Sequence, residues 1–247
     1  MSMFTAVNPK LVKGEELGFR SFGIHFAPSD ISGYQVCASA SAGCTKVCLY
    51  TSGHGKFTRT QEARIKKTRW FFEDRPGFMK TLDKNIQAAM RNADRAKLAP
   101  AFRLNLTSDV RWENVPVLGM FPSASRNIME AYPDVQFYDY TKHTNRRDIP
   151  SNYHLTFSRS ETNDKDVDLM FSRGYNVAVV FNVKKGDPLP AFYKGRPVID
   201  GDLHDLRFLD PQGVWVGLRG KGEAKKDDGY GFVLTPTQDL FQLSRGG

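Results

Sequence analysis

A chain of 247 residues, 40% apolar and 25% charged, is long enough for one sizeable core, and its composition excludes a disordered or fibrous protein. No apolar run approaches the roughly 18 residues that span a bilayer, and no signal peptide begins the chain. The formal charge of +8 favours a polyanionic partner such as nucleic acid or a phosphorylated substrate. We therefore expect a soluble, intracellular protein with no membrane partner, forming a single domain over residues 1–247.

Strands and helices alternate along the chain. In chain order we expect a strand at 21–28, helices at 60–74 and 78–99, a strand at 101–109, a helix at 123–133, strands at 135–141 and 153–160, a helix at 163–174, and strands at 176–183, 196–200, 214–220 and 231–236. The helix at 78–99 places Leu82, Ile86 and Met90 on one apolar stripe. The strand at 176–183 is almost continuously apolar, as in a parallel sheet covered on both faces.

This alternation predicts right-handed βαβ units and an α/β fold. About six to eight strands are too few for a complete eight-fold barrel, and several later connections are too short to hold a helix. The sequence therefore favours a partial or compact (β/α) barrel with an N-terminal metal-binding loop. An open doubly wound sheet is the alternative.

All three cysteines lie in one Gly- and Ser-rich stretch, residues 35–57, with the spacing C-x6-C-x3-C. An odd number of cysteines in a reducing compartment argues against disulfides, so Cys37, Cys44 and Cys48 are predicted metal ligands. Three thiolates suit a [4Fe-4S] cluster with one iron left open to a small ligand. Zinc is the alternative, with His54 or His25 as the fourth ligand.

Polar residues follow the ends of several predicted strands, where chemistry collects in parallel α/β folds. The candidate catalytic residues are Asp139, Lys142, Arg159 and His204, and the candidate cofactor-binding residues are Asn105, Ser108, Asp109 and Ser158. Lys142 and Arg159 suit a carboxylate or phosphate group. Asp139 or His204 suits proton transfer. The alternatives are a structural ion pair for Asp139 and a solvated turn for His204.

A cysteine loop after the first strand, then a helix and a partial barrel, resembles the radical S-adenosylmethionine enzymes. In those enzymes the open iron binds S-adenosylmethionine and cleaves it reductively to a carbon radical. Their usual spacing is C-x3-C-x2-C with a Gly-Gly-Glu stretch after the second strand, whereas this chain has C-x6-C-x3-C and NLTSD. The resemblance implies cluster ligation by the three cysteines and a cofactor-facing position for Asn105, Ser108 and Asp109.

Several longer motifs cover most of residues 20–236. They are GCTKVCLYTSGHG, LNLTSDVRWE, FYDYTKH, YHLTFSRSE, DGDLHDLRFLDP and GLRGKGEAKKDDGYGFVL. With these motifs the chain resembles the bacteriophage "gene product 88" family. The resemblance implies a phage or prophage origin and a protein that acts in the cytoplasm of the infected bacterial host.

Together these observations predict a phage-encoded iron–sulfur protein, with a radical-SAM-like modification of a nucleotide or nucleic acid as its activity and S-adenosylmethionine as its second cofactor. One alternative is a non-catalytic protein, stabilised by a cluster or by zinc, that binds nucleic acid or a host protein. Another is a zinc-dependent transferase or hydrolase with an open zinc position. The sequence leaves the choice open, and it leaves the oligomeric state open as well.

Overall fold

The computed structural model of the protein describes residues 3–5, 12–51, 53–117, 125–225 and 229–236. Its helices are α2 (Ala42–Lys46), α3 (Thr58–Glu73), α4 (Arg75–Arg95), α5 (Ile128–Ala131) and α6 (Asp164–Ser172). Its strands are β1 (Phe19–Gly23), β2 (Ala99–Arg103), β3 (Gln136–Thr141), β4 (Tyr153–Ser158), β5 (Val177–Phe181), β6 (Phe192–Tyr193), β7 (Arg196–Asp200), β8 (Trp215–Arg219) and β9 (Val233–Leu234).

Short 3-10 helices complete the described secondary structure. They are η1 (Glu15–Leu17), η2 (Leu49–Thr51), η3 (Gly53–Lys56), η4 (Trp112–Asn114), η5 (Arg207–Leu209) and η6 (Gly222–Lys225). The expected helix at 123–133 shrinks to α5, which begins after Asn127, whose side chain accepts a hydrogen bond from Glu130 N. The first two residues of that expected helix lie outside the described residues.

The nine strands form one sheet in the order β1-β2-β3-β4-β5-β8-β7-β6, with β9 paired to the end of β5. Every pair is parallel except the β6–β7 hairpin. The first five strands follow chain order, as in a barrel, without the central reversal of a doubly wound sheet. The α/β class and the parallel sheet are thus confirmed.

The sheet does not close into a barrel. Among the described strands, β1 pairs with β2 on one side and makes only an isolated antiparallel bridge, Thr5 to Gly23, on the other. At the far edge, the antiparallel β6–β7 hairpin occupies the position where a further parallel strand would be needed. The expected partial barrel is therefore replaced by an open sheet, because both edges pair locally instead of with each other.

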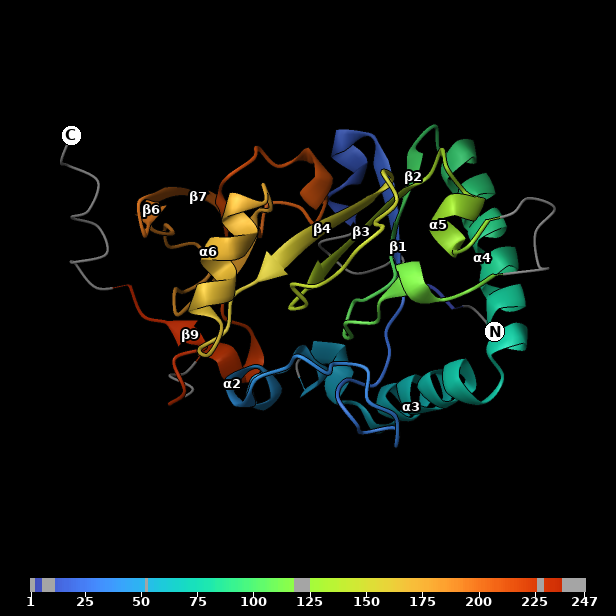
Figure 1. Ribbon diagram of the computed structural model, residues 1–247, viewed down its shortest axis with the longest axis horizontal. Coiled ribbons are helices and arrows are strands. Elements are labelled where there is room, and N and C mark those ends of the chain that lie inside the picture. The colour runs from blue at the N-terminus through green and yellow to red at the C-terminus, as the bar shows by residue number, and fades with distance from the viewer. Residues whose placement is uncertain (1–2, 6–11, 52, 118–124, 226–228, 237–247) are drawn as a thin grey trace.

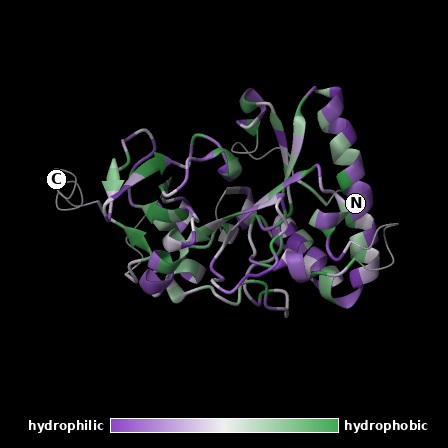
Figure 2. Ribbon diagram, turned by 45° about the horizontal axis from the view of Figure 1, so that its top comes forward, coloured by the Kyte–Doolittle hydropathy of each residue, from purple (hydrophilic) through white to green (hydrophobic). Residues whose placement is uncertain are grey.

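The helices α4 and α6 cover the same face of the sheet. Leu82, Ile86 and Ala93 of α4 pack in the main core with Phe102 and Phe137, and α6 packs on the continuation of that face over β4 and β5. In Figure 2, α4 carries both hydrophobic and hydrophilic residues along its length, as expected of a helix with one buried stripe. None of the described helices is long and apolar enough to cross a membrane.

The break between α3 and α4 has a local cause. Asp74 has a non-helical backbone, and its side chain accepts a hydrogen bond from Gly77 N at 3.0 Å, which caps α4. Pro76 follows in the first turn, where its missing N–H costs nothing. Pro76 and Gly77 therefore start the second helix, and the two helices meet at Asp74.

The opposite face of the sheet is covered by the connection from β7 to β8, residues 201–214. Leu206 of this connection packs on Ala101 and Tyr138 of the sheet. Beside it, the largely buried Arg103 of β2 forms an ion pair with Asp205 at 2.7 Å. The β7–β8 connection thus covers the face of the sheet that, in a closed barrel, would be filled by the side chains of the strands alone.

Candidate functional site

The cysteine-bearing loop lies beyond the carboxyl end of β1 and is anchored to the end of β4. Glu161 accepts hydrogen bonds from Gly43 N at 2.8 Å and from Ser41 Oγ at 2.7 Å, while Ser41 caps α2 by accepting from Cys44 N. Figure 1 shows α2 and α3 along the lower edge of the molecule. The loop therefore lies at the edge of the sheet where we expected chemistry to collect.

The three thiols have different surroundings. Cys37 packs partly against the main core, with its Sγ 3.9 Å from Thr107 O, whereas Cys44 packs against a smaller cluster that includes Val47 and Phe232. In the described part of the chain, no group of three or more His, Cys, Asp or Glu side chains is placed to hold a metal ion. The expected ligand cluster is therefore not formed in the described residues, and Cys37 and Cys44 pack against different apolar clusters.

The thiols nevertheless influence one another electrostatically. Burial raises the pKa of Cys37 to about 11, and Cys48 and Cys44 add to that rise. Burial also raises the pKa of Cys48, with Cys44 adding to the rise and Lys142 and Arg64 opposing it. The three sulfur atoms thus share one electrostatic environment, and two cations face it.

Arg64 is the most unusual of these cations. It is 8% exposed, and its Nε and Nη1 have no hydrogen-bond partner among the described residues. Burial lowers its pKa, and the groups that oppose this effect are Tyr50 and Cys48, with no carboxylate among them. A buried guanidinium without an anion is costly, so this position is suited to one.

Two further basic residues lie on the same side of the sheet. Burial, together with the neighbouring charge of Arg64, lowers the pKa of Lys67 to about 8. Burial likewise lowers the pKa of His25 to about 3, with Arg64, Lys67 and Arg103 contributing. His25 is therefore neutral at pH 7, and its surroundings are positively charged. His54, the other candidate fourth zinc ligand, is exposed on η3.

Asp139 and Asn105 form one buried unit. Asp139 accepts hydrogen bonds from Asn105 N at 2.8 Å, Asn105 Nδ2 at 3.2 Å and Tyr153 Oη at 2.8 Å. Ser108 Oγ donates to Asn105 Oδ1, which links the turn after β2 to this unit. Asp139 thus has the hydrogen-bond partners that a buried carboxyl group needs. These partners are the amide groups of Asn105 and the phenol of Tyr153, whereas the alternative drawn from the sequence was an ion pair with an arginine.

Asp109 joins the loop after β2 to the end of β3. Its Oδ2 accepts from Lys142 N at 2.8 Å, and its backbone N donates to Val36 O at 2.8 Å in the cysteine loop. His143 follows Lys142, and its Nδ1 is 2.9 Å from Ser39 Oγ. The structure therefore brings Asn105, Ser108, Asp109, Asp139 and Lys142 together beside the cysteine loop.

Ser158, Arg159 and His204 have other neighbours. Arg159 Nη1 donates to Gly231 O at 2.6 Å and Phe232 O at 3.2 Å, so this arginine holds the segment before β9. Ser158 is the last residue of β4, and its carbonyl accepts from Asn163 Nδ2. His204 lies in the β7–β8 connection, where its Nδ1 accepts from Leu206 N at 3.2 Å. Its place is with the crossover and not with the cysteine loop.

The predicted catalytic and cofactor-binding residues did not include several basic residues around this edge. They are Arg64, Lys67, Arg111, His143 and Arg146. The signal for Arg64 was present as a cation on the helix after the cysteine loop, but a helical pattern does not say which cation faces inward. Arg146 is recognisable only once its ion pair with Glu113 is formed.

The family model described as Gene product 88 matches residues 3–234. The chain belongs to the gene product 88 family. No curated protein and no solved structure matches it. The family membership thus covers nearly the whole described fold, and it confirms the family resemblance of the sequence motifs.

The anchor formed by Glu161 gives a first prediction. Replacing Glu161 with alanine removes both acceptors for the loop, so we expect the Gly43 amide to exchange its proton at least about tenfold faster. Hydrogen exchange followed by mass spectrometry measures this. The matched control is Glu62→Ala on the exposed face of α3, which should leave the loop peptide unchanged. Equal protection in both variants would refute the anchor.

Asp139 gives a prediction about pH. Burial raises its pKa to about 7, although Arg103, Asn105 and Tyr153 oppose the rise. The folded protein therefore holds a proton that the unfolded chain releases above its ordinary pKa of 3.8, so this group makes stability fall as pH rises from about 4 to about 7. The full effect is about 4 kcal/mol. Asp139→Asn should flatten this part of the curve of unfolding free energy against pH, whereas Asp134→Asn at an exposed position should not.

Proposed function

We propose that the protein is a phage-encoded iron–sulfur protein that binds a [4Fe-4S] cluster through Cys37, Cys44 and Cys48 and acts on a nucleotide or nucleic acid in the infected bacterium. The observation that carries the proposal is the environment of Arg64. This buried side chain lies beside Cys48, and its Nε and Nη1 have no hydrogen-bond partner among the described residues. Cluster-bound cysteines are thiolates, so they supply the anion that this guanidinium lacks.

The loop suits such a ligand set in other respects. The chain has no fourth cysteine, so three thiolates leave one iron open. Small residues and serines separate Cys37 from Cys44, and α2, which carries Cys44, is only five residues long, so little regular structure restrains this part of the loop. A cluster held by Cys37, Cys44 and Cys48 would supply one-electron reduction of a ligand bound beside them.

The chain's own residues would position that ligand. Lys142, next to Asp109, presents an ammonium group at the end of β3, within electrostatic range of Cys48. Asn105, Ser108 and Asp109 hold the turn after β2 against the cysteine loop. In its catalytic form the proposal is a radical-SAM-like modification, with S-adenosylmethionine as the ligand of the open iron.

Metal analysis of protein purified without oxygen tests the proposal. We expect about four iron and four sulfide per chain, with the visible absorption of an iron–sulfur chromophore. Stoichiometric zinc in colourless protein would instead favour the metal-stabilised binding protein. Formation of 5′-deoxyadenosine from S-adenosylmethionine and a reductant then separates an enzyme from a binding protein. Absence of both iron and zinc would refute the proposal.

A further inference from the structure

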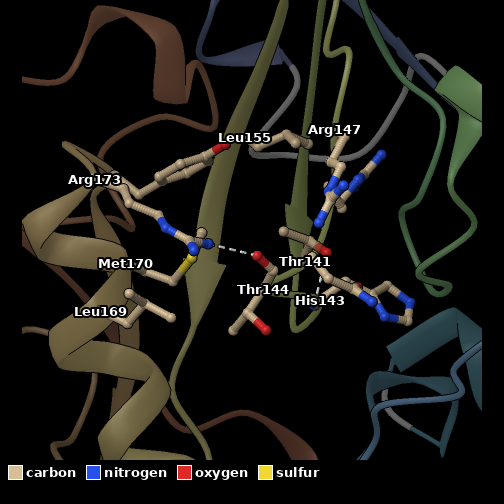
Figure 3. A pocket seen from close by; sticks show the side chains of 11 residues that line it. Thr141, His143, Thr144, Arg147, Leu155, Leu169, Met170 and Arg173 are labelled. Atoms are coloured by element: carbon tan, nitrogen blue, oxygen red, sulfur yellow. Dashed lines mark hydrogen bonds between the residues drawn. The ribbon is translucent and has the colours of Figure 1, made fainter.

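A pocket of about 350 Å³ lies between α6 and the segment that follows β3. Its size is at the lower end of the range for small-molecule sites. Figure 3 shows Leu169, Met170 and Arg173 on one side, and Thr141, Thr144 and Arg147 on the other. Because Thr141 is the last residue of β3, the pocket opens at the same edge of the sheet as the cysteine loop.

The wall of this pocket is cationic. Arg146, Arg147 and Arg173 line it, together with His143 and Asn145, and no aspartate or glutamate lines it. Arg146 is largely neutralised by Glu113, which accepts from its Nε at 2.8 Å. Arg173 and Arg147 form no ion pair with a described carboxylate, and Arg173 Nη1 donates only to the backbone oxygen of Thr144, at 2.7 Å. Two guanidinium groups thus remain available to an anion.

The rest of the wall is largely apolar. It consists of Leu155, Leu169, Met170 and Tyr175, together with Thr141 and Thr144. A ligand that fills this space therefore combines a flat or apolar body with an anionic group. Guanidinium groups donate two parallel N–H groups to the oxygens of a phosphate or a carboxylate, and the net charge of +8 favours a phosphorylated ligand.

The pocket is also linked to the cysteine loop. His143 Nδ1 lies 2.9 Å from Ser39 Oγ, and Arg111 Nη2 lies 3.0 Å from the same nitrogen. Arg111 also donates to Asn145 Oδ1 at 2.7 Å. The His143 residue that lines the pocket thus contacts the segment between Cys37 and Cys44, so a ligand in the pocket lies next to the proposed metal centre.

We propose that this pocket binds the phosphate and part of the body of a nucleoside phosphate, with Arg147 and Arg173 as the phosphate ligands. The proposal rests on the proposed function for the nature of the substrate, but the binding itself needs no metal. The nucleoside phosphate is either free or one unit of a nucleic-acid strand, and both sources present the same chemistry. The net charge of +8 favours either source.

Binding of a fluorescent nucleoside monophosphate, followed by anisotropy at fixed low salt, tests the site. We expect Arg147→Ala and Arg173→Ala each to weaken binding about tenfold, and Arg173→Lys to weaken it less. Inorganic phosphate should compete, and the same nucleoside without its phosphate should bind at least about tenfold more weakly. Arg91→Ala, at an exposed position on α4, is the matched control and should bind as the wild type does.

Charge reversal gives a second, independent variant. Leu169 is 40% exposed, so Leu169→Glu places a carboxylate at the pocket without disturbing the core, and it should abolish binding. Leu17→Glu, at a position 45% exposed on η1, is its control. Wild-type affinity in Arg173→Ala and Leu169→Glu, or equal affinity for nucleoside and nucleotide, would overturn the proposal.

A comparison of two ligands distinguishes a nucleic-acid strand from a free nucleotide as the source of the phosphate. A short single-stranded oligonucleotide that binds more tightly than the mononucleotide, with a steeper dependence on salt, identifies a nucleic-acid strand. Equal affinities identify a free nucleotide. Iron content is measured on every variant, and we expect it to be unchanged in Arg173→Ala. A variant that loses nucleotide binding but keeps its iron therefore supports this pocket as the binding site. Wild-type protein without iron would instead contradict the proposed iron–sulfur function and leave the binding result standing.

Discussion

Single replacement of Cys37, Cys44 or Cys48 by alanine is expected to lower iron from about four per chain to near zero after anaerobic purification. The proposed cluster needs all three thiolates, and the chain contains no other cysteine that could replace a missing one. Iron and sulfide analysis with visible spectroscopy measures the loss. Retained iron in one of the three variants would remove that cysteine from the ligand set.

Thr45→Ala is the matched control for the cysteine series. Thr45 lies on α2 between Cys44 and Cys48, and its hydroxyl donates to Ser41 O at 3.0 Å on the exposed side of the loop. We expect this variant to keep its iron, because no thiolate is lost. If Thr45→Ala lost iron as completely as the cysteine variants, the effect would reflect folding of the loop and not ligation.

Arg64→Met should have different effects on the metal-free and the iron-loaded protein. In metal-free protein the substitution removes a buried cation that lacks an anion, so the melting temperature should rise or stay the same. In iron-loaded protein it removes the cation that faces a thiolate, so iron should be released faster to a chelator. A lower melting temperature of the metal-free variant, or iron release no faster than in the wild type, would contradict the assignment of Arg64 as the counter-charge of the metal centre.

Replacing Asp205 with alanine is expected to destabilise the fold by about 3–5 kcal/mol. Asp205 pairs with Arg103 at 2.7 Å, and their side chains are 3% and 14% exposed. The substitution leaves the guanidinium of Arg103 on the covered face of the sheet without its carboxylate, and the desolvation of that charge is no longer offset. Urea unfolding measures the change in the free energy of unfolding.

The pair of Arg20 and Glu15 offers the comparison for Asp205. Their nitrogen–oxygen distance is similar, at 2.9 Å, but their side chains are 24% and 38% exposed. Because water and salt screen this pair, Glu15→Ala should cost less than about 1 kcal/mol. Comparable losses in the two variants would show that burial does not decide the strength of the Arg103–Asp205 pair.

The periodicity of the chain predicted the secondary structure well where a pattern was long. The helix expected at 78–99 is α4, and the expected strand at 196–200 is β7 with the same bounds. The strand expected at 101–109 ends at Arg103, because the side chains of Asn105 and Ser108 hydrogen-bond within the following turn. Polar side chains that bond locally compete with strand pairing, and periodicity does not reveal that competition.

The candidate site was predicted in part. Strand-end reasoning identified Asp139, Asn105 and Lys142, and these residues lie beside the cysteine loop, since parallel strands end at a common edge. The same reasoning grouped His204 with them, whereas the crossover after β7 carries it to contacts with Leu206 and Arg207. A strand-end rule says where a loop begins and not which way the loop then runs.

The sequence by itself determined the α/β class, the family and the concentration of all three cysteines in one loop. Local pattern and composition suffice for these features, because they depend on residues close together in the chain. Only the tertiary structure decided that the sheet stays open, that Arg64 is buried beside Cys48, and that Arg147 and Arg173 share one pocket. Each of these depends on residues far apart in sequence, and their burial and charge follow from packing, which no local pattern records.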